Sequence, residues 1–342
     1  MNRRAKLGPI VVASIIMLGG GQIAVAQVDW AYQDVCVEPG DPGTWDSANH
    51  QVADVVFDGT TYHLFAVGGQ TLLSFNSPWS VGHWTATNLN GPWTEDPNNP
   101  VLEPEPGAWD GYTIYHAAVR YDGVNFQMWY GAVDSYPGLI SVGYATSANG
   151  SLWTKYAGNP LPGLTPGASG TWDDNGMFPG TVLFDGSKYG MWFTAVKYNG
   201  SSGTWTIGYA SSTNGLEWIK HPIPVLVGTR AWEGELLYFP EVIPSGNGFS
   251  MWYSAISADP VARIGYAVSS DGLNWGKWPA NPVLSPQGCN IVDSLAVVVE
   301  GDEIHGWTNH CYDITHVTSP FEVVFFDAFE TGDTGIWSLA VP

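Results

Sequence analysis

The chain has 342 residues, of which 44% are hydrophobic, 14% aromatic and 13% charged. This composition excludes a disordered chain, and the length allows one large β domain or two smaller ones. The 42 Gly and 24 Pro residues indicate many turns and few long helices. With 32 Asp and Glu against 11 Lys and Arg, the formal net charge is -21, and because such a surface repels phosphate we expect no nucleic-acid partner.

The first 26 residues have the pattern of a secretory signal peptide. Three basic residues precede a short apolar run at 9–18, and an Ala-Val-Ala cleavage signal follows at 24–26. We therefore expect a secreted or periplasmic protein whose mature chain begins near Gln27. The apolar run is too short to span a bilayer, and no later segment is long enough. We expect a monomer.

The rest of the chain repeats itself at steps of roughly 60 residues. Each repeat opens with Trp and an acid, followed by an apolar run that ends in a turn and then by an alternating aromatic run. A (Val/Ile)-Gly-Tyr-Ala-x-Ser run, an Asn-Gly or Asp-Gly turn and another Trp complete most of the repeats. The opening pairs are Trp45-Asp46, Trp109-Asp110, Trp172-Asp173 and Trp232-Glu233.

Each repeat is predicted to form four short strands joined by hairpins. Asn-Gly and Asp-Gly tolerate φ > 0 at both centres of a type I′ turn, which makes them hairpin signals. The aromatic runs are apolar on both faces, so each sheet needs a neighbour on both sides. Such units predict an all-β, five-bladed β-propeller with four antiparallel strands per blade. It would occupy 27–326, with blades at about 45–102, 109–162, 172–226, 232–284 and 287–326.

The fifth repeat is degenerate, with strands expected at 292–299, 304–309, 314–318 and 322–326. Its first turn lies near residue 301 and places Cys289 almost opposite Cys311, so we predict a disulfide between them. Cys36 then stays free, or replaces one partner if 28–37 docks beside this unit. The acidic, aromatic segment 327–342 is expected to be a C-terminal tail, and no chemistry is assigned to it.

The order of these motifs resembles the five-bladed propeller glycosidase superfamily, which includes glycoside hydrolase families 43, 32 and 130. The likeness covers roughly residues 40–326. It implies a central funnel in which three carboxylates from the first strands of different blades surround the sugar. One is the base or nucleophile, one is the general acid, and one tunes the pKa and holds the sugar. Glycoside cleavage requires one protonated and one ionised carboxyl group.

The acids fall into two groups. An acid directly after Trp recurs in four repeats, which favours a structural role because a catalyst must be unique. The acids that break the repeat are Asp174, Glu235 and Asp293, in the segments leading into three different first strands. We predict Glu235 as proton donor, with Asp174 and Asp293 sharing the base and pKa-tuning roles. The alternative is that they are solvated loop acids. Asp54 and Glu241 share a later strand position and are expected to face neighbouring blades.

The same segments supply candidate sugar-binding residues. Where the first two segments lack an extra acid, they carry His50 and His116, which could bind sugar hydroxyls or a cation. A single histidine is more often a hydrogen-bonded structural residue than one that binds a ligand. No metal motif is present, and no cofactor is predicted. The aromatic residues of these segments that have no strict repeat partner are Tyr112, Tyr115, Phe178 and Tyr238.

The leading hypothesis for function is a secreted glycoside hydrolase acting on a poly- or oligosaccharide. A non-catalytic glycan-binding propeller and an interaction propeller are the alternatives, because one fold hosts many functions. A sialidase is disfavoured, since that chemistry needs clustered arginines to hold a carboxylate. The predicted mature chain has three, at unequal places in the repeats: Arg120, Arg230 and Arg263.

Overall fold

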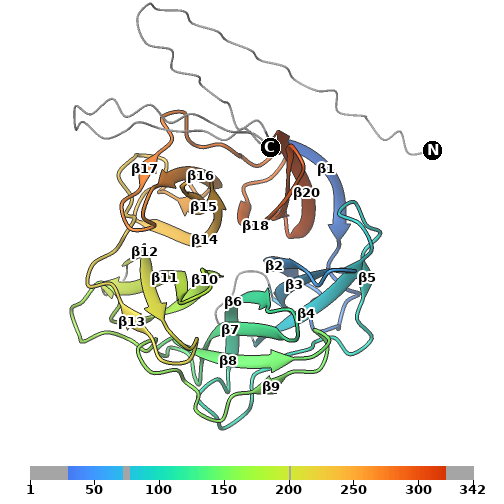
Figure 1. Cartoon of the computed structure of the whole chain (residues 1–342), viewed down its shortest axis with the longest axis horizontal. Helices are drawn as coiled ribbons and strands as arrows, with labels where there is room; N and C mark the ends of the chain where they lie inside the picture. The colour runs from blue at the N-terminus through green and yellow to red at the C-terminus, as the bar shows by residue number, and fades with distance from the viewer. Residues whose placement is uncertain (1–29, 72–77, 200–201, 321–342) are drawn as a thin grey trace, which may run out of the picture.

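The computed structural model of the chain describes residues 30–71, 78–199 and 202–320, and these form antiparallel β-sheet units (Figure 1). The predicted signal peptide at 1–26 and the predicted tail at 327–342 lie outside the described residues. In the part of the chain that is described, no helix has the length and apolarity needed to cross a membrane.

The strands follow the repeats of the sequence, and each unit pairs its strands in hairpin order. Unit 1 contains β2 (Asn49–Phe57), β3 (Tyr62–Gly69), β4 (Trp79–Ala86) and β5 (Thr94–Glu95). Unit 2 contains β6 (Thr113–Tyr121), β7 (Phe126–Val133), β8 (Ser141–Ser147) and β9 (Thr154–Lys155). Unit 3 contains β10 (Gly176–Phe184), β11 (Tyr189–Asn199), β12 (Ser202–Ser212) and β13 (Ile219–Lys220). Unit 4 contains β14 (Leu236–Ser245), β15 (Gly248–Ile256), β16 (Ala262–Ser269) and β17 (Gly276–Lys277).

Unit 5 is completed by a strand from the other end of the described chain. It contains β18 (Val292–Glu300), β19 (Glu303–His310) and β20 (Asp313–Pro320), and β1 (Ala31–Val37) pairs antiparallel with β20. The prediction gave this place beside β20 to 322–326, which lie outside the described residues. Strand pairing between distant segments of this kind leaves no local signal in the sequence. The pairing of β1 with β20 joins the two ends of the repeat array.

Neighbouring units are joined where the third strand of one meets the start of the next. At three of these boundaries a single parallel pair of residues makes the joint: Ile140–Gly176, Trp205–Leu236 and Ala262–Ile291. The bridge at Trp205 merges units 3 and 4 into one eight-stranded sheet. Figure 1 shows the units arranged around a common centre, with the first strand of each unit nearest to it.

The turns between third and fourth strands differ from the predicted type I′ hairpins. Gly150 has φ 77°, but Asn149 before it is not in the positive-φ region. The Asn149 side chain instead accepts hydrogen bonds from the backbone N–H groups of Ser151 and Leu152, at 3.1 and 3.0 Å. A side chain that satisfies the backbone in this way stabilises a longer loop, so the two strands need no two-residue turn.

The Trp residues bind these loops within and between units. The indole N–H of Trp218 donates to the carbonyl oxygen of Gly215 at 3.0 Å, and Trp129 of the preceding unit donates to the same oxygen at 2.9 Å. Trp129 is also fully buried. A buried indole N–H needs an acceptor, so this contact lets a large ring enter the core without an unpaired donor. Trp192 and Trp275 share the carbonyl oxygen of Gly272 in the same way, so these Trp residues couple units 2 to 3 and 3 to 4.

Candidate functional site

The acids that follow Trp are ion-paired to lysines of the short fourth strands in units 2, 3 and 4. Lys155 contacts Asp110 at 2.6 Å, and Lys277 contacts Glu233 at 2.5 Å. The third pair joins Lys220 to Asp173. These carboxylates are nearly fully buried, so each needs its counter-charge to offset the cost of leaving water. Their contacts are those of a structural group, which is the role that recurrence in four repeats predicts.

In unit 1, His50 contacts the acid that follows Trp, as the lysines do in units 2, 3 and 4. The fourth strand there carries Glu95 in place of Lys, and His50 Nε2 lies 2.9 Å from Asp46 Oδ2. Burial alone would raise the pKa of Asp46, but hydrogen bonds from His50 and Thr44 bring it below its ordinary value. His50 was predicted to bind substrate. The structure buries its ring completely, edge-on to Trp84 at 5.2 Å.

Asp293 lies in the interior, at the start of β18. Its Oδ1 accepts a hydrogen bond from the Asn309 side chain at 2.8 Å, and its Oδ2 accepts one from the Tyr238 hydroxyl at 3.2 Å. Burial raises the pKa of this carboxyl to about 6, although both hydrogen bonds favour the ionised form. Asp293 can therefore exchange a proton under mildly acidic conditions, which an ordinary surface aspartate does not do.

The environment of Asp293 includes residues that sequence reasoning missed. A bulge in β18 leaves Ser294 in the left-handed region with φ 52°, and Thr308 donates to the Asp293 carbonyl oxygen at 2.8 Å. Thr308 and Asn309 stand where other repeats have an aromatic residue and its neighbour after Met-Trp. That departure from the repeat was the signal available in the sequence.

Four of the predicted binding residues lie near one apolar cluster. The cluster contains Phe178 and Tyr238, which are both buried, with Tyr112 and Tyr115 half-buried against it. The rings of Tyr115 and Phe178 are 6.3 Å apart. Burial and the nearby phenols of Tyr198, Tyr136 and Tyr112 raise the pKa of Tyr115. The structure therefore places these aromatic residues together, with Tyr238 linking them to Asp293.

Asp174 and Glu235 are placed differently from Asp293. Asp174 Oδ2 accepts a hydrogen bond from the backbone N–H of Gly170 at 2.8 Å, within its own loop. Its Oδ1 is buried and has no hydrogen-bond partner among the residues that the structure describes. Glu235 is exposed and accepts a hydrogen bond from Thr204 at 3.5 Å. Asp174 thus bonds within its own loop and Glu235 bonds to Thr204 of β12, and within the described part of the chain neither acid is hydrogen-bonded to Asp293.

His116 is the side chain that connects all the units. Its Nδ1 lies 2.9 Å from the carbonyl oxygen of Pro179 in unit 3, and its Nε2 lies 3.2 Å from that of Val52 in unit 1. Nε2 is also 3.3 Å from the Ser294 hydroxyl of unit 5, and the ring stacks on Phe239 of unit 4 at 4.3 Å. Burial lowers the pKa of this imidazole to about 4. His116, predicted to bind substrate, is buried at this junction.

Asp54 and Glu241 contact neighbouring units, as their shared strand position predicts. Asp54 accepts a hydrogen bond from the Val119 N–H of unit 2 at 2.9 Å, and Glu241 accepts one from the Val297 N–H of unit 5 at 3.0 Å. Burial raises the pKa of both carboxyls, and the negative charge of Asp54 raises that of Glu241 further. These acids tie first strands together.

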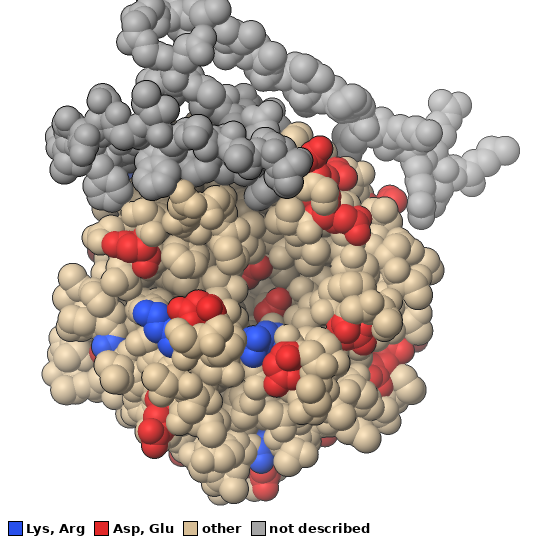
Figure 2. Space-filling view, viewed as in Figure 1, with Lys and Arg blue, Asp and Glu red and all other residues tan. Residues whose placement is uncertain are grey.

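The face of the molecule seen in Figure 2 is hollowed near its centre, and acidic side chains lie in the hollow. Figure 1 places this centre where the first strands meet. An acidic hollow at this point suits neutral, hydroxyl-rich ligands, because carboxylates accept strong hydrogen bonds from hydroxyl groups.

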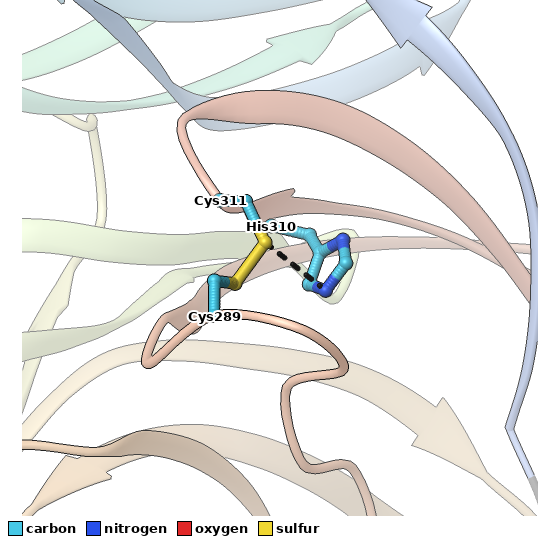
Figure 3. A group of neighbouring side chains, drawn as sticks. All are labelled: Cys289, His310 and Cys311. Atoms are coloured by element: carbon cyan, nitrogen blue, oxygen red, sulfur yellow. Dashed lines mark hydrogen bonds between the residues drawn. A yellow bond between two sulfur atoms is a disulfide. The ribbon is translucent and has the colours of Figure 1, made fainter.

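The grouping that most resembles a metal site contains Cys289, His310 and Cys311 (Figure 3). The two cysteines form a disulfide, as predicted, and His310 Nε2 lies 3.4 Å from the Cys311 sulfur. Disulfide sulfurs are not the thiolates that bind metals, so this group acts as a covalent link between two loops. Cys36 is free, and burial raises its pKa to about 11.

No family model matches the sequence, and no curated protein matches it either. The structure matches many solved ones. A protein from Bacteroides thetaiotaomicron described as a glycosidase has a TM-score of 0.67 at 13% identity, over 86% of this chain and 97% of that one. A thermostable family-43 glycoside hydrolase has a TM-score of 0.60 at 21% identity, over 80% and 91% of the two chains.

A third match comes from work on family 130, whose mannoside phosphorylases include hydrolases that target β-1,2 mannosidic linkages in Candida mannan. Its TM-score is 0.64 at 12% identity, over 88% of this chain and 99% of that one. At such identities the likeness concerns the arrangement of the backbone. As its repeats predict, the chain has the fold of the β-propeller glycosidases, which include members of families 43 and 130.

Proposed function

We propose that the protein is a secreted carbohydrate-active enzyme, a glycoside hydrolase that acts on a poly- or oligosaccharide. In this proposal the five units are the blades of a closed propeller, at about residues 45–102, 109–162, 172–226, 232–284 and 287–326. The glycosidase-like fold and the acidic central hollow support it. The catalytic carboxylates would be Asp174, Glu235 and Asp293.

The observation that carries the proposal is the environment of Asp293. A general acid must hold its proton near the working pH, which requires a raised pKa. Burial gives Asp293 a pKa of about 6, and the Tyr238 hydroxyl orients its Oδ2. Asp293 therefore suits the proton-donor role better than Glu235, which is exposed to water. Glu235 and Asp174 remain the candidates for the base and for holding the sugar.

The test is a screen of aryl-glycosides and of plant and microbial polysaccharides, followed by carboxylate variants on any substrate found. Asp293→Asn should lower kcat by roughly 10²-fold or more, because an amide cannot donate the proton. Glu217→Gln is the matched control, since Glu217 is an exposed acid on an outer loop. Thermal unfolding of each variant checks folding. Full activity in a folded Asp293→Asn variant would remove Asp293 from the mechanism.

A non-catalytic glycan-binding protein is the second candidate, and the separation of the acids favours it. Asp174 bonds within its own loop and Glu235 bonds to Thr204 of β12, so in the described residues neither is hydrogen-bonded to Asp293. Carboxylates held apart in this way can accept hydrogen bonds from sugar hydroxyls without acting as an acid–base pair. Binding to a glycan array with no released product, in wild type and in Asp293→Asn alike, would decide for this candidate.

A further inference from the structure

Exposed aromatic and aliphatic side chains gather where unit 2 meets unit 3. Residues 134–140 connect β7 to β8, and within them Tyr136 is 50% exposed and Leu139 57% exposed. Tyr198, near the end of β11, is 47% exposed. Large rings that stay half in water offer an apolar face and a hydroxyl at once. Together, Tyr136, Leu139 and Tyr198 form the tyrosine patch.

Asn175 holds the two sides of the patch at a fixed spacing. Its side-chain oxygen accepts a hydrogen bond from the Tyr198 N–H at 3.0 Å, and its carbonyl oxygen accepts one from the Ile140 N–H at 3.0 Å. The phenol of Tyr136 is close enough for its charge to contribute to the raised pKa of Tyr198. Asn175 therefore links the Tyr198 backbone to the end of the loop that carries Tyr136 and Leu139.

The patch is continuous with the interior cluster beside Asp293. Ile140 and Val196, which flank the exposed rings in sequence, belong to the same buried cluster as Phe178 and Tyr238. Tyr112 and Tyr115 pack on that cluster. Aromatic rings in contact lead from Tyr115 through Phe178 and Trp205 to Tyr238, whose hydroxyl donates to Asp293.

An open hollow of roughly 350 Å³ lies at the same loop. It is lined by Trp109, Asp134, Ser135, Gly138, Leu139 and Ser141, without Lys or Arg. Small-molecule sites of a few hundred Å³ combine apolar walls with a few polar groups that fix orientation. Here the Asp134 carboxylate and two serine hydroxyls supply the polar groups. The chemistry matches a neutral sugar, whose ring has apolar C–H faces and hydroxyl edges.

We propose that the tyrosine patch and this hollow form an outer subsite that binds a neutral oligosaccharide chain leading to Asp293. The proposal rests on the proposed function, because the chain it binds is the substrate of that site. The rings of Tyr136 and Tyr198 stack on sugar faces, and Asp134 accepts hydrogen bonds from hydroxyl groups. The subsite favours polymeric over short substrates.

The experiment compares binding of wild type and variants to a glycan array of neutral and acidic oligosaccharides. The best neutral glycan is then titrated by calorimetry. The double variant Tyr136→Ala with Tyr198→Ala should weaken Kd by about tenfold or more, and Tyr136→Trp with Tyr198→Trp should retain binding because the stacking face remains. Tyr156→Ala is the matched control, as Tyr156 is 42% exposed on another loop.

The outcomes separate this proposal from the proposed function. Unchanged affinity in the double alanine variant, or no neutral glycan bound by wild type, overturns the subsite. Loss of affinity in that variant supports the subsite even if no turnover is found, in which case the hydrolase proposal alone fails. If turnover occurs, the double variant should raise KM for the polysaccharide while kcat on a short aryl-glycoside stays within twofold.

Discussion

The hydroxyl group of Tyr238 lies 3.2 Å from Oδ2 of Asp293 and connects unit 4 to a buried carboxylate of unit 5. The contact shifts the pKa values of both groups. Burial and the negative charge of Asp293 raise the pKa of Tyr238 well above its ordinary value, so the phenol stays protonated and remains a donor. The same hydrogen bond holds the pKa of Asp293 lower than burial alone would set it.

Removing that hydroxyl should therefore raise the pKa of Asp293. In Tyr238→Phe the ionised carboxylate loses a donor, and a hydrogen bond to a charged group is worth about 1.5–3 kcal/mol, or roughly one pH unit or more. We expect the carboxyl resonance of Asp293, followed by NMR, to titrate above the wild-type value of about 6. The same midpoint in both proteins would show that the hydroxyl does not bond the carboxylate in solution.

The buried ion pair of unit 4 should matter far more for stability than a surface pair. Lys277→Met leaves the Glu233 carboxylate buried with the Tyr253 hydroxyl and backbone donors alone, and unpaired buried charges cost about 3–5 kcal/mol. Arg263→Met is the control, because its partner Asp259 is half exposed and such pairs contribute under about 1 kcal/mol. Urea unfolding measures the free energy of unfolding of both variants. Equal losses of stability in the two would contradict the structural role of the Trp-acid motif.

The disulfide should stabilise unit 5 mainly through the unfolded chain. The two cysteines are 22 residues apart, and closing a loop of that size lowers the unfolded-state entropy by an amount worth about 3 kcal/mol. Cys289→Ser with Cys311→Ser should lower the free energy of unfolding by roughly this amount. A peptide map without reductant should show Cys36 as the free thiol. A map with Cys36 in the main disulfide would refute the pairing.

His116 should make stability depend on pH. Its folded pKa is about 4, against an ordinary value of 6.5, so the unfolded chain binds the extra proton first as pH falls. The contribution of neutral His116 is complete above about pH 6.5 and is lost towards pH 4. The stability difference between wild type and His116→Gln should therefore shrink by about 3 kcal/mol over that range. A difference independent of pH would contradict the burial of the imidazole.

The contribution of Asp54 to stability should depend on pH in the opposite way to that of His116. Burial raises its pKa to about 7, so the folded state binds the proton more tightly than the unfolded chain does. Its contribution is present below about pH 4 and is lost as pH rises through 7. Asp54→Asn keeps an oxygen for the Val119 N–H and cannot ionise. We expect this variant to gain stability relative to wild type between pH 5 and pH 8, measured by thermal unfolding.

The candidate site shows where sequence reasoning reaches its limit. Unique polar residues in the repeats directed attention to Asp293, and its burial was not visible until the chain folded. His50 also broke the repeat, yet it pairs with Asp46 because unit 1 carries Glu95 where other units carry lysine. A departure from a repeat can thus replace a structural contact as well as mark a site. Only the residues that the side chain contacts in the folded structure distinguish the two cases.

The sequence by itself predicted the strands of units 1 to 4, the grouping into repeats and the favoured Cys289–Cys311 pairing, because alternating side chains, turn residues and short loops act between nearby residues. Tertiary structure decided the partner of β20, the central position of His116 and the proton affinity of Asp293. These depend on segments far apart in the chain that meet only after folding. Burial and hydrogen bonding are set by those meetings, so no local pattern could reveal them.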